Sequence, residues 1–158
     1  MIENGKYPVL NGGITYSGNT DSWNVPAGTV TISEGGNSCG HVNYIMEKFW
    51  SGGHCYSLEP YPDKILAKYL FFMLKQDQTK IMRLRVGSGL PNIQRESLKN
   101  FMITIPPLDE QKAIASILSK SDEEISMLEK QRDVIEEQRK YLINNLVTGK
   151  IRLPKFRN

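Results

Sequence analysis

Two adjacent prolines, Pro106 and Pro107, separate a glycine-rich and turn-rich amino half of this sequence from one continuous helical pattern. Proline lacks a backbone N–H and disfavours helix in the residue before it, so an extended segment must end at this pair. Asp109 can cap the segment that follows, and Glu110 adds a carboxylate near the positive end of a helix dipole. The sequence therefore predicts a long helix that starts at Asp109.

The composition is that of an ordinary globular protein. The 158 residues suffice for one modest domain with an appendage, and 39% hydrophobic with 23% charged residues excludes general disorder. No apolar run reaches the roughly 18 residues that span a bilayer, and the first residues lack the pattern of a signal peptide. We therefore expect a cytoplasmic protein that does not associate with membranes, in which Cys39 and Cys55 are reduced thiols.

Basic residues are concentrated in one part of the chain. Residues 64–99 contain eight basic residues and two acidic ones. An excess of positive charge on this scale suits a phosphate backbone. The alternative is a solvated helix face, and the charge pattern alone leaves both interpretations open.

Short β-rich runs alternate with turns in the amino half. The runs predict strands at residues 7–10, 29–33, 41–44, 54–58 and 101–105. The glycine-rich segments 11–13, 17–19, 34–40 and 51–53 allow positive φ angles and close backbone approach, so these loops can contact ligands. The apolar spacing over 65–83 instead predicts a helix with one buried face.

The carboxyl half carries a heptad repeat with Ser121, Arg132 and Arg139 as polar members. It predicts a coiled-coil-forming helix over 109–147, about 58 Å long, which is more than one small domain covers alone. The predicted dimerisation residues are its apolar members Ile114, Leu118, Ile125, Leu128, Ile135, Leu142 and Leu146. Two alternatives are a seam that packs on the protein's own domain and a helix broken near 121–124. Gly149 is expected to end the helix.

Several motifs of this chain resemble the specificity subunits of type I restriction-modification systems and the specificity portions of some type II methyltransferases. They are Gly-Ser-Gly-Leu-Pro-Asn-Ile-Gln at 87–94, Ile-Thr-Ile-Pro-Pro-Leu-Asp-Glu-Gln at 103–111 and Leu-Val-Thr-Gly-Lys-Ile-Arg at 146–152. Their order resembles the end of a target-recognition domain followed by one conserved spacer helix. Segments 7–9, 11–13 and 31–40 resemble the interior of such a domain, so the resemblance covers nearly the whole chain.

The resemblance implies an α+β fold in two parts. Residues 1–106 would form a small β-rich target-recognition domain with a packed helix, shortened at its amino terminus relative to the family. Residues 107–158 would form a conserved spacer and dimerisation helix with a short carboxyl tail. Family members usually carry two recognition domains and two spacer regions, whereas this chain has one of each. Two identical chains can supply the second copy, so we expect a homodimer.

The resemblance also implies a non-catalytic function without a cofactor. The chain would be the DNA sequence-specificity subunit of a methyltransferase or restriction complex, bind a bipartite target in double-stranded DNA, and dock DNA methyltransferase subunits through its long helix. Whether a restriction or translocase subunit joins the complex stays open. The alternative is an interaction module, or a truncated specificity fragment, that pairs with another specificity chain without reading DNA.

Base reading requires donors and acceptors aimed at base edges, and basic residues on phosphates set the register. The candidates for base or groove contact are Tyr16, Ser17, Asn19, Asn37, Ser38, His41, Ser88, Asn92 and Gln94. The alternative for each polar loop residue among them is that it only stabilises a turn of the backbone. The candidates for phosphate contact are Lys80, Arg83 and Arg85, of which the two arginines can clamp phosphate or guanine in bidentate fashion.

An enzymatic or metal-binding alternative depends on Cys39, His41, His54 and Cys55. In structural zinc sites, two cysteines or two histidines are separated by two to five residues. Each pair in this chain instead combines one cysteine with one histidine, and the adjacent His54 and Cys55 would point to opposite faces of a strand. No third residue that would orient a thiol–imidazole pair is identified, and the sequence has neither a phosphate-binding loop nor a convincing motif for the methyl donor. We therefore expect neither a metal site nor catalysis.

Overall fold

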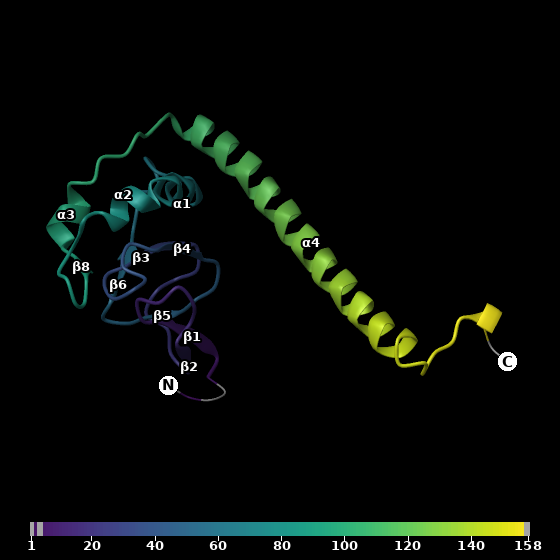
Figure 1. Cartoon of the computed structure of the whole chain (residues 1–158). Helices are drawn as coiled ribbons and strands as arrows, with labels where there is room; N and C mark the ends of the chain where they lie inside the picture. The colour runs from purple at the N-terminus through teal and green to yellow at the C-terminus, as the bar shows by residue number, and fades with distance from the viewer. Residues whose placement is uncertain (1, 3–4, 157–158) are drawn as a thin grey trace. The chain divides into compact units, whose positions relative to one another are not determined.

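The computed structural model describes residue 2 and residues 5–156 and divides the chain into two compact units, residues 1–115 and 116–158. The first unit contains all eight strands that are described, three short helices and the first two turns of the long helix (Figure 1). The second unit contains the rest of that helix and the carboxyl tail. The α+β fold with a long terminal helix is therefore confirmed.

Three small sheets build the first unit. In one, β3 (Thr29–Ser33) lies between β4 (Val42–Ile45) and β6 (Cys55–Leu58) and is antiparallel to both. In another, β1 (Tyr7–Leu10) lies between the antiparallel β2 (Gly18–Thr20) and the parallel β5 (Trp50–Ser51). The third is the hairpin of β7 (Arg85–Val86) and β8 (Asn92–Ile93).

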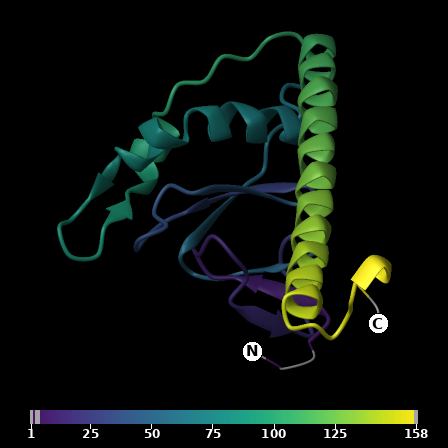
Figure 2. The same cartoon turned by 45° about the vertical axis from the view of Figure 1, so that its right-hand side comes forward.

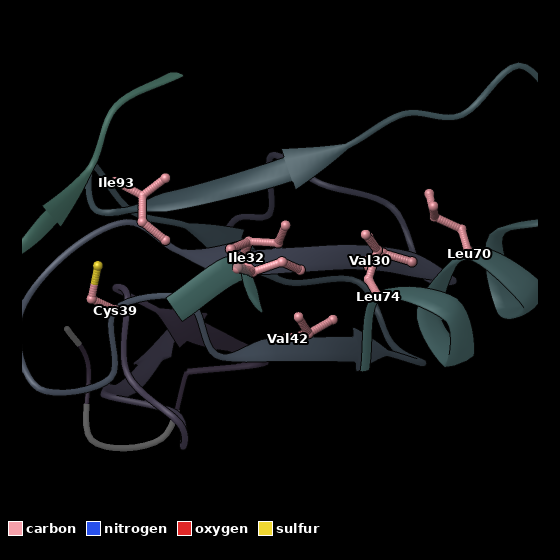
Figure 3. Packing of buried hydrophobic residues seen from close by; sticks show 8 residues of the cluster. Val30, Ile32, Cys39, Val42, Leu70, Leu74 and Ile93 are labelled. Atoms are coloured by element: carbon pink, nitrogen blue, oxygen red, sulfur yellow. The ribbon is translucent and has the colours of Figure 1, made fainter. Parts of the chain in front are cut away.

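The main hydrophobic core lies between the β4-β3-β6 sheet and helix α1 (Ala67–Gln76). Every residue of β3 is buried, and its Val30 and Ile32 belong to the same cluster as Leu70 and Leu74 of α1 (Figure 3). Ile93 of β8 joins this cluster, so the hairpin is anchored to the core. Burial of side chains of this size contributes about 1.5–3 kcal/mol each, which fixes α1 and the hairpin on the sheet.

The prediction of one continuous helix over 65–83 is wrong. This segment forms two helices, α1 and α2 (Gln78–Met82), which are divided at Asp77. Tertiary hydrogen bonds explain the division. The Val42 N–H donates to Oε1 of Gln78 at 2.9 Å, and Nζ of Lys75 donates to the Val42 carbonyl oxygen at 3.0 Å. The side chains of Lys75 and Gln78, on either side of Asp77, therefore bind the backbone N–H and carbonyl groups of Val42 at the edge of β4.

The strand predicted at 101–105 is also wrong, because residues 101–107 have no sheet partner. The Thr104 carbonyl oxygen instead accepts a hydrogen bond from the Tyr69 hydroxyl at 3.0 Å. The strands predicted at 41–44 and 54–58 exist but begin one residue later, at Val42 and Cys55. No pattern in the sequence indicated the two- and three-residue strands or the short helix α3 (Arg95–Lys99).

The long helix, α4 (Leu108–Leu146), is drawn as one continuous coil in Figure 2. It begins one residue before the predicted start. Asp109 therefore lies in its first turn and not at its cap. The helix is unbroken across 121–124, and Gly149, with a φ of 71°, follows its end as expected. Residues Pro154–Phe156 form a short 3-10 turn. None of the helices in the described residues is long and apolar enough to cross a membrane.

Candidate nucleic-acid interface

The glycine-rich loop 34–40 lies against the β7–β8 hairpin. The Ile93 N–H donates to the Glu34 carbonyl oxygen at 2.8 Å, and the Gly36 N–H donates to the Pro91 carbonyl oxygen at 2.9 Å. Gly35 and Asn92 form an isolated β-bridge. These bonds bring two segments together that carry five of the predicted base-contact residues, namely Asn37, Ser38, Ser88, Asn92 and Gln94.

The end of the same loop packs on α2. Gly40 has a φ of 86°, and a Cβ atom added there would lie 2.9 Å from the Cα atom of Met82, the last residue of α2. Lys80 and Arg83 flank this contact, and Arg85 follows in β7. We define the basic loop region as residues 34–41 and 80–95. It contains nine of the twelve predicted DNA-contact residues, and its four basic residues outnumber the single acid Glu34.

The basic side chains of the basic loop region differ in whether a nearby carboxylate already pairs with them. Arg83 and Arg85 are exposed, and neither forms an ion pair with another described residue. Nζ of Lys80 lies 2.6 Å from the Asp77 carboxylate, so part of its charge is already balanced. The two arginines are therefore better placed than Lys80 to bind an anion.

The surroundings of His41 favour the neutral form of its imidazole. Burial lowers the pKa of this imidazole, and the nearby Lys75 ammonium lowers it further. Its Nε2 lies 3.1 Å from Oδ1 of Asn43, and this contact opposes the shift. His41 can therefore exchange neutral hydrogen bonds at pH 7 but adds no charge to the basic loop region.

Three predicted DNA-contact residues lie elsewhere, because Tyr16, Ser17 and Asn19 belong to the β2-β1-β5 sheet and the turn that leads into it. The Tyr16 hydroxyl donates to the Glu47 carboxylate at 3.2 Å, and burial, helped by Glu47, raises the pKa of Tyr16. The Ser38 hydroxyl donates to the Gly12 carbonyl oxygen at 2.6 Å, which joins the loop 34–40 to the segment that follows β1.

One residue that the sequence did not single out, Glu34, is the only carboxylate of the basic loop region. Its Oε1 lies 3.1 Å from the Tyr56 hydroxyl, which also lies 2.9 Å from the Ile93 carbonyl oxygen. Burial raises the pKa of Tyr56, and the charge of Glu34 adds to the effect. A carboxylate at such a position can accept a hydrogen bond from the cytosine amino group. A single acid inside a glycine-rich loop has no periodic signal that could have revealed it.

Both cysteines are free thiols that pack with the hydrophobic clusters. Sγ of Cys39 donates to the Glu34 carbonyl oxygen at 3.1 Å, and burial raises the pKa of both Cys39 and Cys55. A thiol with a raised pKa is a weak nucleophile and a weak metal ligand. Among the described residues, no three His, Cys, Asp or Glu side chains are grouped so that they could hold a metal ion.

The heptad seam of α4 is largely exposed in the isolated chain. Leu128 is 57% exposed and Ile135 is 63% exposed, and the other leucines of the seam are exposed as well. The only buried residues of α4 are Gln111 and Ala115, in its first two turns. A row of exposed aliphatic side chains at heptad spacing is the surface that another helix would cover.

Comparisons with known proteins agree with these observations. The model of the type I restriction modification DNA specificity domain matches residues 2–137. A protein assigned as a type I specificity subunit in Mycoplasma genitalium is 36% identical over 126 residues, which cover 78% of this chain and 33% of that protein. The MjaVIII specificity subunit of Methanocaldococcus jannaschii is 37% identical over 93 residues, covering 58% of this chain and 22% of that protein.

A solved structure gives the same result. The crystal structure of the type I restriction-modification system S subunit from M. genitalium superposes with a TM-score of 0.75 at 31% sequence identity, over 91% of this chain and 39% of that chain. The chain therefore spans between about a fifth and two fifths of the length of these relatives. The matched family model covers most of the sequence, and the chain belongs to the type I restriction-modification DNA specificity domain family.

Proposed function

We propose that this chain is a non-catalytic specificity subunit that reads double-stranded DNA through the basic loop region. The observation that carries the proposal is the convergence of loop 34–41, the end of α2 and the β7–β8 hairpin, which gathers polar side chains around Arg83 and Arg85. Exposed arginines can hold phosphates and set the register, while neighbouring amide and hydroxyl groups read base edges.

We further propose that the chain acts as a homodimer. The chain contains one recognition domain and one spacer helix, and a second identical chain would supply another of each. The exposed seam of α4, with Leu128 and Ile135 at its centre, is a surface suited to that partner. A closed twofold dimer presents the same reading surface twice, so its target would be an inverted repeat interrupted by a fixed gap.

In this proposal residues 1–106 read DNA and residues 107–158 space the two reading surfaces. The long helix also docks the DNA methyltransferase subunits, which carry the chemistry of the complex. Membership of the specificity family supports this division of labour. The chain would then determine where methylation occurs without taking part in the reaction.

The salt dependence of duplex binding tests the proposal. A reader that neutralises about six phosphates releases their counterions, so log K should fall with log salt at a slope near −5. Titration of a labelled duplex at several salt concentrations measures that slope. An interaction module that pairs only with another specificity chain would show almost no binding and no such slope.

A further inference from the structure

The start of α4 is held by one fully buried amide side chain. Gln111 is 0% exposed, and in the whole of α4 only Ala115, one turn later and 5% exposed, is also buried. Oε1 of Gln111 accepts a hydrogen bond from the Leu66 N–H at 2.8 Å. Its Nε2 donates to the carbonyl oxygens of Lys64 and Pro106, both at 2.8 Å. Both donor hydrogens and the oxygen of this amide are therefore used.

These hydrogen bonds connect the beginnings of two helices. Leu66 is the N-cap residue of α1, and α1 has no side-chain cap of its own. Gln111 accepts the N-cap N–H from outside the helix, as the glutamate or glutamine of a capping box does from within one. Because α1 packs on the β4-β3-β6 sheet, Gln111 ties the first turn of α4 to the rigid centre of the recognition domain.

The segment that leads into α4 has no regular structure of its own. Residues 101–107 form no helix or strand, and this connector is held by the hydrogen bond from Tyr69 to Thr104 and by the packing of Phe101 and Ile103 against the main core. We infer that Gln111 is the positioning residue that fixes the direction in which α4 leaves the recognition domain, and through it the gap between the two DNA half-sites. The second part of this inference rests on the proposed function, whereas the first part does not.

Because α4 is long, a small rotation of the helix at Gln111 produces a large displacement at its other end. Residues 111–146 of a continuous helix span about 52 Å at 1.5 Å per residue, so a rotation of about 10° at the joint displaces the far end by about 9 Å. That distance is between two and three base pairs at about 3.4 Å each. A spacer helix can hold one gap length only if its joint allows less movement than this.

The substitution Gln111→Glu tests the joint because it keeps the size of the side chain but removes both donors and faces two carbonyl oxygens with a carboxylate. The matched control is Gln138→Glu, the same change at an exposed position of the same helix. Spin labels attached through p-acetylphenylalanine at the exposed positions Met46 and Glu137 report the distance between the recognition domain and α4. Dilution into unlabelled protein restricts the measurement to labels within one chain.

We expect one narrow distance distribution in the parent chain and in Gln138→Glu, and at least a twofold broader one in Gln111→Glu. Circular dichroism establishes that each variant is folded. If Gln111→Glu does not fold, Gln111→Met, which keeps the length without any hydrogen bond, is measured in its place. A folded Gln111 variant with a distribution as narrow as the parent's would overturn the inference, because a residue that only adds stability would lower the melting temperature without changing the width.

Selection from randomised duplexes tests the consequence for DNA. We expect Gln111→Glu to retain the half-site sequence of the parent chain but to accept several gap lengths. Retention of a single gap length would overturn the inference about spacing. If the parent chain itself enriches no motif, the proposed function fails, and the spin-label distances still decide whether Gln111 fixes the joint.

Discussion

A Cβ atom on Gly40 would lie 2.9 Å from the Cα atom of Met82, so the loop 34–40 ends in direct contact with the backbone of α2. The basic loop region depends on this contact, because it places the glycine-rich loop beside Arg83 at the end of the helix. Gly40 also has a φ of 86°, which side chains rarely adopt. Two independent constraints therefore require glycine at this position.

Gly40→Ala should lower the free energy of unfolding by about 2–4 kcal/mol, because the methyl group adds a backbone clash to the left-handed conformation. Urea denaturation measures the change. The matched control is Gly36→Ala in the same loop, where φ is 72° but no atom lies within 4 Å of the added Cβ. It should cost about 1–2 kcal/mol, from the backbone conformation alone. Equal losses in the two variants would contradict the packing of this loop on α2.

Replacing Arg83 and Arg85 together with alanine should flatten the salt slope of duplex binding by about two, because each arginine in contact with phosphate displaces roughly one counterion. Fluorescence anisotropy at several salt concentrations measures the slope. Lys120→Ala with Lys130→Ala removes the same charge from α4 and should leave the slope unchanged. If the slope stays the same in the arginine variant, these residues do not contact phosphate.

Changing Leu128 and Ile135 to aspartate should convert the dimer into monomers, because two charges per chain would be buried in the seam without partners. Light scattering coupled to size-exclusion chromatography measures the mass. Ser116→Asp with Ser126→Asp places two aspartates at exposed positions outside the seam and should leave the dimer intact. A dimer that survives the seam substitutions would show that the seam is not the interface.

Stability should depend on the protonation of His41. Burial holds the pKa of His41 below its ordinary value of 6.5, so the unfolded chain binds a proton at a higher pH than the folded chain does. The free energy of unfolding should therefore decrease as the pH falls below about 6.5. His41→Gln removes this contribution, so the loss of stability between pH 7.5 and 5.5 should be smaller than in the parent chain. Urea denaturation at these pH values measures this loss, and an identical loss in both proteins would contradict a lowered pKa of the half-buried His41.

The sequence predicted the long helix better than any other element. The proline pair, the heptad repeat from Ile114 to Leu146 and Gly149 located the start and the end of α4 to within one residue. Strands of two residues, such as β5, carry no periodicity, and β5 exists only because the distant strand β1 pairs with it. The division of the 65–83 helix at Asp77 likewise depends on contacts of Lys75 and Gln78 with β4, which no local pattern encodes.

The candidate site likewise contains residues that the sequence predicted and residues whose roles depend on long-range contacts. The charge pattern and the glycine-rich loops located the residues that the basic loop region gathers, and their contacts with DNA remain predictions. The roles of Glu34 and Gln111 did not emerge from the sequence, because each depends on partners far away in the chain. Gln111 lies inside a motif that was singled out, yet a polar residue in the first turn of a helix is ordinarily exposed. Only the structure places it at 0% exposure between two helix starts.

Selection of bound sequences from randomised duplexes, with and without the cognate DNA methyltransferase subunit, tests the proposed DNA reading most directly. The retained duplexes are sequenced and aligned. A homodimeric reader predicts an inverted repeat interrupted by one fixed gap, with the two halves read by identical surfaces. The absence of any enriched motif, even with the methyltransferase subunit present, would contradict DNA reading by this chain.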